Sequence, residues 1–338
     1  MSDHEGAPDV KDIMRMRLAP GSEGMPDVKD IMRARRQAPR RIASVVRVPL
    51  PCSLIGNRVQ GDLQCNHPAK PCGPVACSRL GCGVSCAGYL PEDAIDLPPG
   101  GWKRNLLFHM HSAPGAWQWH AEQIRRRLPL FTGRRIIAVT TGGGLDDPAK
   151  IREALPGCEV LEVPNNPTLR EVATFEPLFG LLAGTDGVTL YAQSKGATRK
   201  PPETGRRWAE VLYETCCDYW PWVEQVLRWH PLAGTFLKIG TGWKAEQSRS
   251  DWHYSGSWFW FRNADLYAKE WRKIDQFNHG IEPYPSLHFG DHEAGCLFYR
   301  GDVAKLNLYD WSFWAKTVEP ELTTWQRNHL FQRTAVSV

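Results

Sequence analysis

The sequence predicts one α/β domain over residues 100–320, with a mixed, mostly parallel sheet flanked by helices, and a C-terminal tail at residues 321–338. Apolar runs typical of strands alternate there with helical patterns, which is the order that a parallel sheet requires. All fifteen tryptophans of the 338-residue chain lie between Trp102 and Trp325. Because tryptophan belongs to packed cores and binding surfaces, we expect the packed domain to begin near Gly100. Hydrophobic residues make up 42% and charged residues 23%, as in ordinary globular proteins.

The pattern along the chain predicts strands and helices in alternation. Strands are expected at residues 105–109, 135–140, 159–163, 188–192, 232–238 and 257–261. Helices are expected at residues 118–128, 148–155, 168–182, 204–229 and 263–274, and Pro221 is expected to kink or break the fourth. Ligands of such sheets bind beyond the carboxyl ends of the strands. We therefore expect function in the loops that follow the strands.

Residues 1–48 are expected to form a flexible tail, and they contain a duplicated octapeptide. Pro8–Arg15 and Pro26–Arg33 are identical, and in each copy valine, isoleucine and methionine fall on one face of a helix. A helix of about two turns is unstable alone in water. Either the repeats fold when they dock in the groove of a protein partner, or they form a leader without a partner. We read the arginines that follow as a solvated basic run and do not expect nucleic acid as a partner.

The composition also limits the compartment. No apolar stretch is long enough to span a membrane, and the polar N-terminus lacks the apolar centre of a signal peptide. We therefore expect a cytoplasmic protein. In a reducing cytoplasm, clustered thiols bind metal more often than they pair as disulfides.

Residues 49–92 form a cysteine-rich segment that has many glycines and prolines but few large apolar residues. Such a segment cannot fold on a hydrophobic core and needs a metal or covalent staple. A structural zinc is expected, with thiolate ligands drawn from Cys65, Cys72, Cys77, Cys82 and Cys86. No Cys-x-x-Cys knuckle occurs, so an iron–sulfur cluster, disulfides or no cofactor stay open as alternatives.

Polar residues follow the first and fourth expected strands. His111 and Trp117 follow the first, and the run from Gln193 to Gly196 follows the fourth, with Arg199 close behind. A lysine and a glycine at the end of a strand are well placed to meet an anion, as Lys195 and Gly196 are here. The glycines of residues 142–144 match no phosphate-binding motif and are read as a plain loop.

Two later loops offer further candidates. His253, Tyr254, Ser255 and Gly256 precede the aromatic run of the sixth strand, and Glu282 lies in a proline-rich loop. Hydroxyl groups, a histidine and flat aromatic rings are what a carbohydrate site uses, because rings stack on sugar C–H faces and polar groups bind sugar hydroxyls. The aromatic strand itself is expected to lie mostly in the core.

These runs together resemble a group of bacterial glycosyltransferase-like proteins. In that group a strand ends in His-[Ser/Ala]-Lys-Gly, a helix carries Arg-Trp, and a later strand opens with His-[Tyr/Phe]-Ser-Gly and an aromatic. The matching segments here are Tyr191–Gly196, Arg207–Trp208 and His253–Trp260, within a match over most of residues 102–314. The cysteine-rich segment resembles the leader of some members. Gln193 departs from the group, which usually has a histidine there.

The resemblance implies a GT-A-like fold and transfer of a sugar from a nucleoside-diphosphate sugar to a glycan or other acceptor. We expect the catalytic roles on Lys195, His253 and Glu282. Donor or acceptor contacts are expected from His111, Trp117, Gln193, Ser194, Gly196, Arg199, Arg207, Trp208, Tyr254, Ser255 and Gly256.

Sugar transfer needs compensation for the charge that develops on the leaving diphosphate, by a divalent metal or by lysine and arginine. It also needs a base for the acceptor proton when configuration inverts. No Asp-x-Asp metal motif is evident, and Asp251 with His253 is its nearest substitute, so an active-site manganese or magnesium is left open. The alternative is a degenerate domain that binds ligands or partners without turnover. The absent Asp-x-Asp motif and Gln193 favour it.

Overall fold

The computed structural model describes residues 95–197, 202–240, 248, 250–302, 306–330 and 333, together with the backbone of a short hairpin at residues 55–59 and 62–65. The octapeptide repeats, Arg199, and Cys72, Cys77, Cys82 and Cys86 lie outside the described residues. The chain divides at residue 48 into two units, and all described residues belong to the second unit. The hairpin pairs β1 (Ile55–Val59) with β2 (Asp62–Cys65) in antiparallel fashion.

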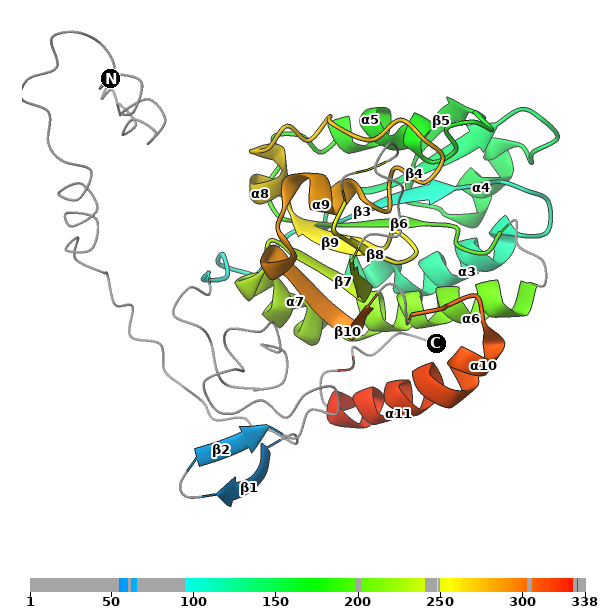
Figure 1. Ribbon diagram of the computed structural model, residues 1–338. Coiled ribbons are helices and arrows are strands. Elements are labelled where there is room, and N and C mark those ends of the chain that lie inside the picture. Colours follow the sequence, from blue (N-terminus) through cyan, green and yellow to red (C-terminus); the bar gives the residue numbers. More distant parts are fainter. Residues whose placement is uncertain are drawn as a thin grey trace, which may run out of the picture. The chain divides into compact units, whose positions relative to one another are not determined.

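An eight-stranded mixed sheet organises the described α/β part (Figure 1). Its strands are β3 (Arg104–Met110), β4 (Arg135–Thr141), β5 (Glu159–Pro164), β6 (Val188–Gln193), β7 (Leu232–Ile239), β8 (Trp252–Tyr254), β9 (Phe259–Arg262) and β10 (Ala294–Asp302). The order is β10-β7-β9-β6-β3-β4-β5, and β8 pairs with β7. β3 to β6 run parallel, while β9 lies antiparallel between β6 and β7. The α/β class with a mostly parallel sheet is therefore confirmed.

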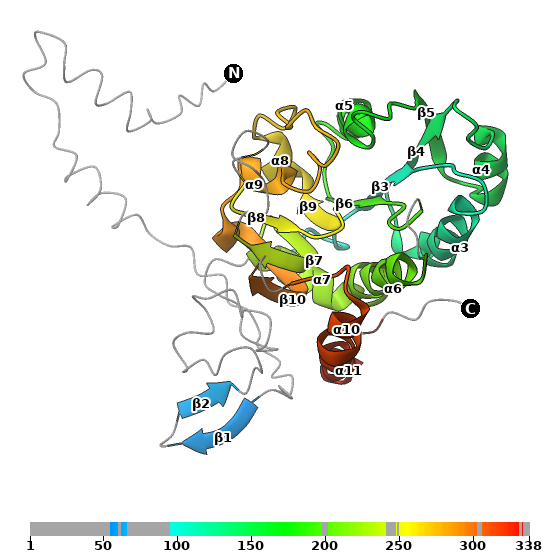
Figure 2. The same cartoon turned by 45° about the vertical axis from the view of Figure 1, so that its right-hand side comes forward.

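Helices cover both faces of this sheet (Figure 2). The first face carries α3 (Trp117–Arg127), α4 (Pro148–Ala154), α6 (Pro202–Tyr213), α7 (Trp220–Trp229), α10 (Trp311–Phe313) and α11 (Glu319–Asn328). The second face carries α5 (Val172–Gly180), α8 (Asn263–Tyr267) and α9 (Tyr284–His288). Within the described part of the chain, no helix combines the length and the apolar character that crossing a membrane requires.

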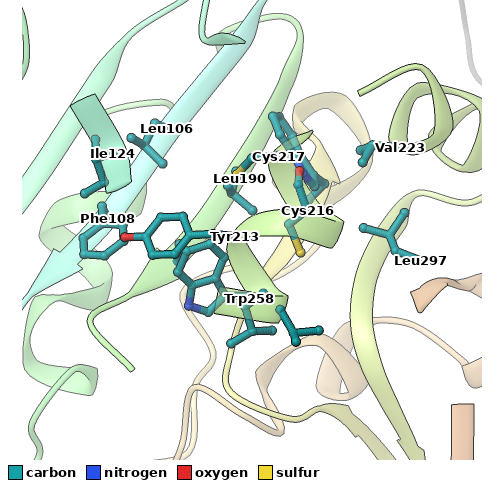
Figure 3. Packing of buried hydrophobic residues seen from close by; sticks show 14 of the residues in the cluster. Leu106, Phe108, Ile124, Leu190, Tyr213, Cys216, Cys217, Val223, Trp258 and Leu297 are labelled. Carbon is teal, nitrogen blue, oxygen red and sulfur yellow. The ribbon is translucent and has the colours of Figure 1, made fainter. Parts of the chain in front are cut away.

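Alternation along the strands explains why two cores form. In β3, Leu106 and Phe108 pack in the core of the first face, whereas Leu107 packs in that of the second. In the first core, Figure 3 shows Tyr213 of α6 next to Trp258, with their ring centroids 4.5 Å apart in an edge-on arrangement. This core therefore ties α6 to the turn that precedes β9.

Three expected elements differ in the structure. The helix expected over residues 204–229 is interrupted by a π-helical turn at Glu214–Asp218, and α7 begins with Pro221 in its first turn, where proline removes no helical hydrogen bond. The helix expected over residues 263–274 ends at Tyr267. We also expected a tail from residue 321, but α11 continues to Asn328 because Leu322 and Trp325 pack in the first core.

A buried ion pair holds α3 to the π-helical turn. Nε and Nη2 of Arg127 donate to the two carboxylate oxygens of Asp218, at 2.6 and 2.7 Å. The side chains of Arg127 and Asp218 are only 11% and 6% exposed. The guanidinium of Arg127 also lies over the ring of Tyr213. A bidentate pair this deep is satisfied only while both partners are present.

We predict that Asp218→Asn destabilises the domain, because it leaves the Arg127 guanidinium buried without its counter-charge. The free energy of unfolding, measured by urea denaturation, should fall by about 3–5 kcal/mol. As a matched control, Glu122→Gln removes the partner of two arginines on the exposed side of α3 and should reduce it by less than about 1 kcal/mol. Equal losses in the two variants would contradict the structural role given to Arg127 and Asp218.

Candidate functional site

The loop after β6 carries Lys195 and is held firmly on both sides. On one side, the Ser194 hydroxyl accepts a hydrogen bond from the backbone N–H of His111, at 2.9 Å. On the other, the side-chain amide of Gln193 donates to the carbonyl of Gly256, at 3.2 Å. Gly196 has a φ of +85°, and a Cβ there would lie 2.8 Å from the backbone of Gly205 in α6. Glycine is therefore required where this loop turns toward α6.

The turn between β8 and β9 faces this loop. Gly256 has a φ of +99°, and a Cβ there would come within 3.1 Å of Leu212 and Trp208 on α6. Ser255 is 3% exposed, and its backbone N–H donates to the Phe236 carbonyl of β7. The positive φ of 58° at Ser257 also keeps the turn tight at some cost in backbone strain.

Glu282 joins the loop and the turn at one point. Its Oε1 lies 3.5 Å from the Nζ of Lys195 and accepts a hydrogen bond from the backbone N–H of Gly256, at 3.2 Å. Both charged side chains are 13% exposed. Burial alone would raise the pKa of Glu282, but Lys195, His253, the Gly256 N–H and His279 together bring the pKa below its usual value. Glu282 is therefore a carboxylate at neutral pH.

Lys195 is fixed by a second contact. Its ammonium lies over the indole of Trp208, 4.1 Å from the ring centroid, in a cation–π arrangement. Trp208 is 1% exposed, so this aromatic face of α6 forms a wall of the site. The lysine thus lies between a carboxylate and a ring, which together fix where its charge sits.

His253 lies beside the ion pair and is 4% exposed. The pKa of His253 is lowered to about 4, chiefly by burial and also by the nearby Lys238 and Lys195, while Glu282 opposes the shift. The imidazole is therefore neutral at pH 7, so it can donate one hydrogen bond and accept another. The structure brings together Lys195, His253 and Glu282, the three residues that the sequence singled out for catalysis, although their roles stay predictions.

His111 directly follows β3, and Trp117 is the first residue of α3. The His111 ring is 3.5 Å from the hydroxyl of Thr140, and the indole of Trp117 donates to Asp146 at 2.8 Å. Trp117 is only 5% exposed. The bond between the Ser194 hydroxyl and the N–H of His111 connects these residues to the Lys195 loop.

Two other candidates have partners elsewhere. The guanidinium of Arg207 forms a bidentate pair with Glu319 of α11, at 2.7 and 2.8 Å, and contacts Glu210 on its own helix. The hydroxyl of Tyr254 donates to the Gly295 carbonyl of β10, and its ring is fully buried. In this structure both residues therefore join parts of the fold rather than face the Lys195–Glu282 pair.

Sequence reasoning missed two residues whose charges reach the site. Glu171 precedes α5 and is 9% exposed, and burial raises its pKa to about 7, with Glu282 adding to the effect. Lys238 lies near the carboxyl end of β7 and is 8% exposed. Glu171 lies in the segment after β5 and Lys238 lies near the end of β7, so both are on the side of the sheet where ligands are expected to bind. We had assigned Glu171 to a helix and Lys238 to a strand, so neither was considered as a site residue.

The described residues offer no metal site: no group of three or more histidine, cysteine, aspartate or glutamate side chains is arranged there to hold an ion. The Asp251–His253 pair considered above acquires no third donor among them. The zinc expected in the cysteine-rich segment concerns ligands that, apart from the backbone of Cys65, lie outside the described residues.

Comparisons with known proteins give weak likenesses. No family model and no curated protein matches the chain. Glucosyl-3-phosphoglycerate synthase from Mycobacterium tuberculosis is similar in structure over 68% of this chain and 82% of its own, at 14% identity and a TM-score of 0.36. A mannosyltransferase from Pyrobaculum calidifontis, solved with GDP-Man and Mn2+, is similar over 77% of each chain, at 10% identity and a TM-score of 0.35.

A 4-diphosphocytidyl-2C-methyl-D-erythritol synthase is also similar, over 65% of this chain and 99% of its own, at 13% identity and a TM-score of 0.30. Likenesses at these scores carry no argument about this chain. The α/β class of this chain follows from its own sheet. A function has to be inferred from the residues at the carboxyl ends of the strands.

We predict a pH-dependent stability from Glu171. Its pKa is about 7 in the folded chain against an ordinary 4.5, so the folded protein holds this proton more tightly than the unfolded chain does. The contribution of Glu171 to the free energy of unfolding should therefore fall as pH rises from 4.5 to 7. Relative to the native protein, the free energy of unfolding of Glu171→Gln should rise by about 2.5 kcal/mol between pH 5 and pH 8, measured by urea denaturation.

Glu176→Gln is the matched control, because Glu176 lies on the same helix but is 64% exposed. Its difference from the native protein should stay constant across this pH range. A constant difference for Glu171→Gln as well would show that Glu171 titrates normally.

Proposed function

We propose that the α/β domain transfers a sugar from a nucleoside-diphosphate sugar to a glycan or other acceptor. The observation that carries the proposal is the contact between the Lys195 loop, the His253–Gly256 segment and Glu282 at one edge of the sheet. Three chain segments remote in sequence thus supply a cation, a neutral imidazole and a carboxylate at one place. A transferase of this kind can use the cation to stabilise the leaving diphosphate and the carboxylate to take the acceptor proton.

Lys195 would stabilise the leaving group. As the sugar C1–oxygen bond to the diphosphate breaks, its electron pair stays on the diphosphate, whose negative charge rises. An ammonium held in place beside this oxygen, in surroundings that largely exclude water, lowers the barrier without having to reorganise. The ring of Trp208 and the carboxylate of Glu282 give Lys195 this fixed position.

Glu282 would be the base. When the acceptor oxygen forms its bond to C1, the acceptor proton passes to the Glu282 carboxylate. Its lowered pKa keeps it ionised at neutral pH, which a proton acceptor requires. Neutral His253 and the Ser255 hydroxyl would bind sugar or acceptor hydroxyls, and Gln193, Ser194 and Gly196 would hold the loop that presents Lys195.

The GT-A resemblance raises the question of an active-site manganese or magnesium. The described residues do not present a donor set for one, since the carboxylate of Glu282 already pairs with Lys195. We therefore assign no step to a metal. Addition of manganese is a variable of the assay below.

A second candidate function is ligand or partner binding without turnover. One observation favours it: Gln193, which replaces the usual histidine of the resemblance, is engaged with the carbonyl of Gly256. In this case the N-terminal octapeptides and the cysteine-rich segment would dock partners. Donor binding without release of a nucleoside diphosphate would separate this function from transfer.

We predict that the purified protein releases nucleoside diphosphate from one donor in a panel of UDP-, GDP- and TDP-sugars, tested with and without manganese. Lys195→Ala should reduce the rate at least a hundredfold, since a lost charge contact to a transition state is worth about 3 kcal/mol. Lys316→Ala, at an exposed position in the π-helical segment Trp314–Val318 that follows α10, should keep the native rate.

Thermal unfolding of each variant shows whether it is folded. A rate that Lys195→Ala leaves unchanged would refute the role of this lysine. Neither release nor binding of any donor would refute the proposed transferase.

A further inference from the structure

Lys238 stands next to the candidate catalytic residues on the sheet. In the antiparallel pairing of β7 and β8 it lies directly opposite His253. Directly opposite residues of an antiparallel pair project from the same face of a sheet, so the two side chains are neighbours. Lys238 is also near enough to Glu282 and Lys195 for both to influence its pKa.

The charges around Lys238 do not balance. Lys195 is neutralised by its ion pair with Glu282, whereas in the described part of the chain Lys238 forms no ion pair. The other nearby carboxyl is that of Glu171, whose raised pKa leaves it partly protonated at neutral pH. Among the described residues, this lysine, which is 8% exposed, therefore has no carboxylate paired with it.

A buried ammonium without a counter-ion is costly, because burial removes water from the charge and nothing replaces it. Burial accordingly lowers the pKa of Lys238, although Glu282 opposes this effect. Such a group destabilises the protein until an anion is bound. Conversely, a bound anion would restore the charge balance of the whole cluster.

A pocket of about 630 Å³ lies between α3, α6 and α11, and its lining contains paired charges. There Arg127 is paired with Asp218, and Arg207 is paired with Glu319 of α11. By contrast, Lys238 forms no ion pair with any described residue.

We propose that Lys238 binds the diphosphate of the donor as a second cation beside Lys195. The inference rests on the proposed transfer function and adds to it the residue that supplies net positive charge. The charges of Lys195 and Glu282 cancel. The net positive charge that attracts the diphosphate would therefore come from Lys238. In this arrangement Lys195 remains the counter-ion of Glu282. Glu282 then stays ionised and can take the acceptor proton.

The test measures binding by isothermal titration calorimetry, with no turnover required. Native protein, Lys238→Met and Lys103→Met are titrated with UDP, GDP and TDP, with the matching nucleosides, and with inorganic pyrophosphate. Methionine keeps the apolar stem and removes the charge. Lys103 is a matched control, because it is exposed and precedes β3 at the opposite end of the sheet.

Lys238→Met should weaken nucleoside diphosphate and pyrophosphate binding at least tenfold, as expected for one charge-assisted hydrogen bond, and leave nucleoside binding unchanged. Lys103→Met should bind like the native protein. Lys238→Met should also unfold at the same or a higher temperature, since a buried uncompensated charge is gone.

Unchanged diphosphate and pyrophosphate affinity in Lys238→Met would overturn the proposal. A lower unfolding temperature, with binding that Lys238→Arg does not restore, would also overturn it and give Lys238 a structural role. Should native protein bind pyrophosphate through Lys238 but no nucleoside diphosphate, the anion site would stand and the nucleotide-sugar function would fail. If the native protein bound neither pyrophosphate nor any nucleoside diphosphate, both the anion site and the proposed transfer function would be refuted.

Discussion

The ion pair between Lys195 and Glu282 is the contact on which the candidate site depends. It links the loop after β6 to the loop before α9, and Glu282 also holds the backbone of Gly256. Each of the two side chains is 13% exposed. Removal of one partner destabilises the protein, because the charge of the other partner stays buried. The surrounding aromatic packing, with Trp208 under Lys195, keeps water from replacing the missing partner.

Most strands could be predicted from the sequence because their apolar runs are bounded by turns. The expected strands at residues 105–109 and 135–140 became Arg104–Met110 and Arg135–Thr141. β8 was missed because it has only three residues, too few for a periodic signal. α11 was assigned to a tail because its apolar stripe is sparse, and only its packing against β10 makes Leu322 and Trp325 core residues.

The site could be predicted in part, for a definite physical reason. Residues in loops after strands were read as candidates, and Lys195, His253 and Glu282 do meet. Burial and charge balance arise only when distant segments pack, so the raised pKa of Glu171 and the lowered pKa of Lys238 left no trace in the local sequence. Likewise, the pairing of Arg207 with Glu319 depends on where α11 docks.

The departure at Gln193 bears on whether the site can work. Its amide nitrogen donates to the Gly256 carbonyl, while the N–H of the same glycine donates to Glu282. Gln193 therefore stabilises the turn that positions the carboxylate, a task that needs a hydrogen-bond donor rather than a charge. A protonated histidine there would add positive charge near Lys195 and His253. With glutamine, the positive charge around Glu282 comes from Lys195 and Lys238 instead.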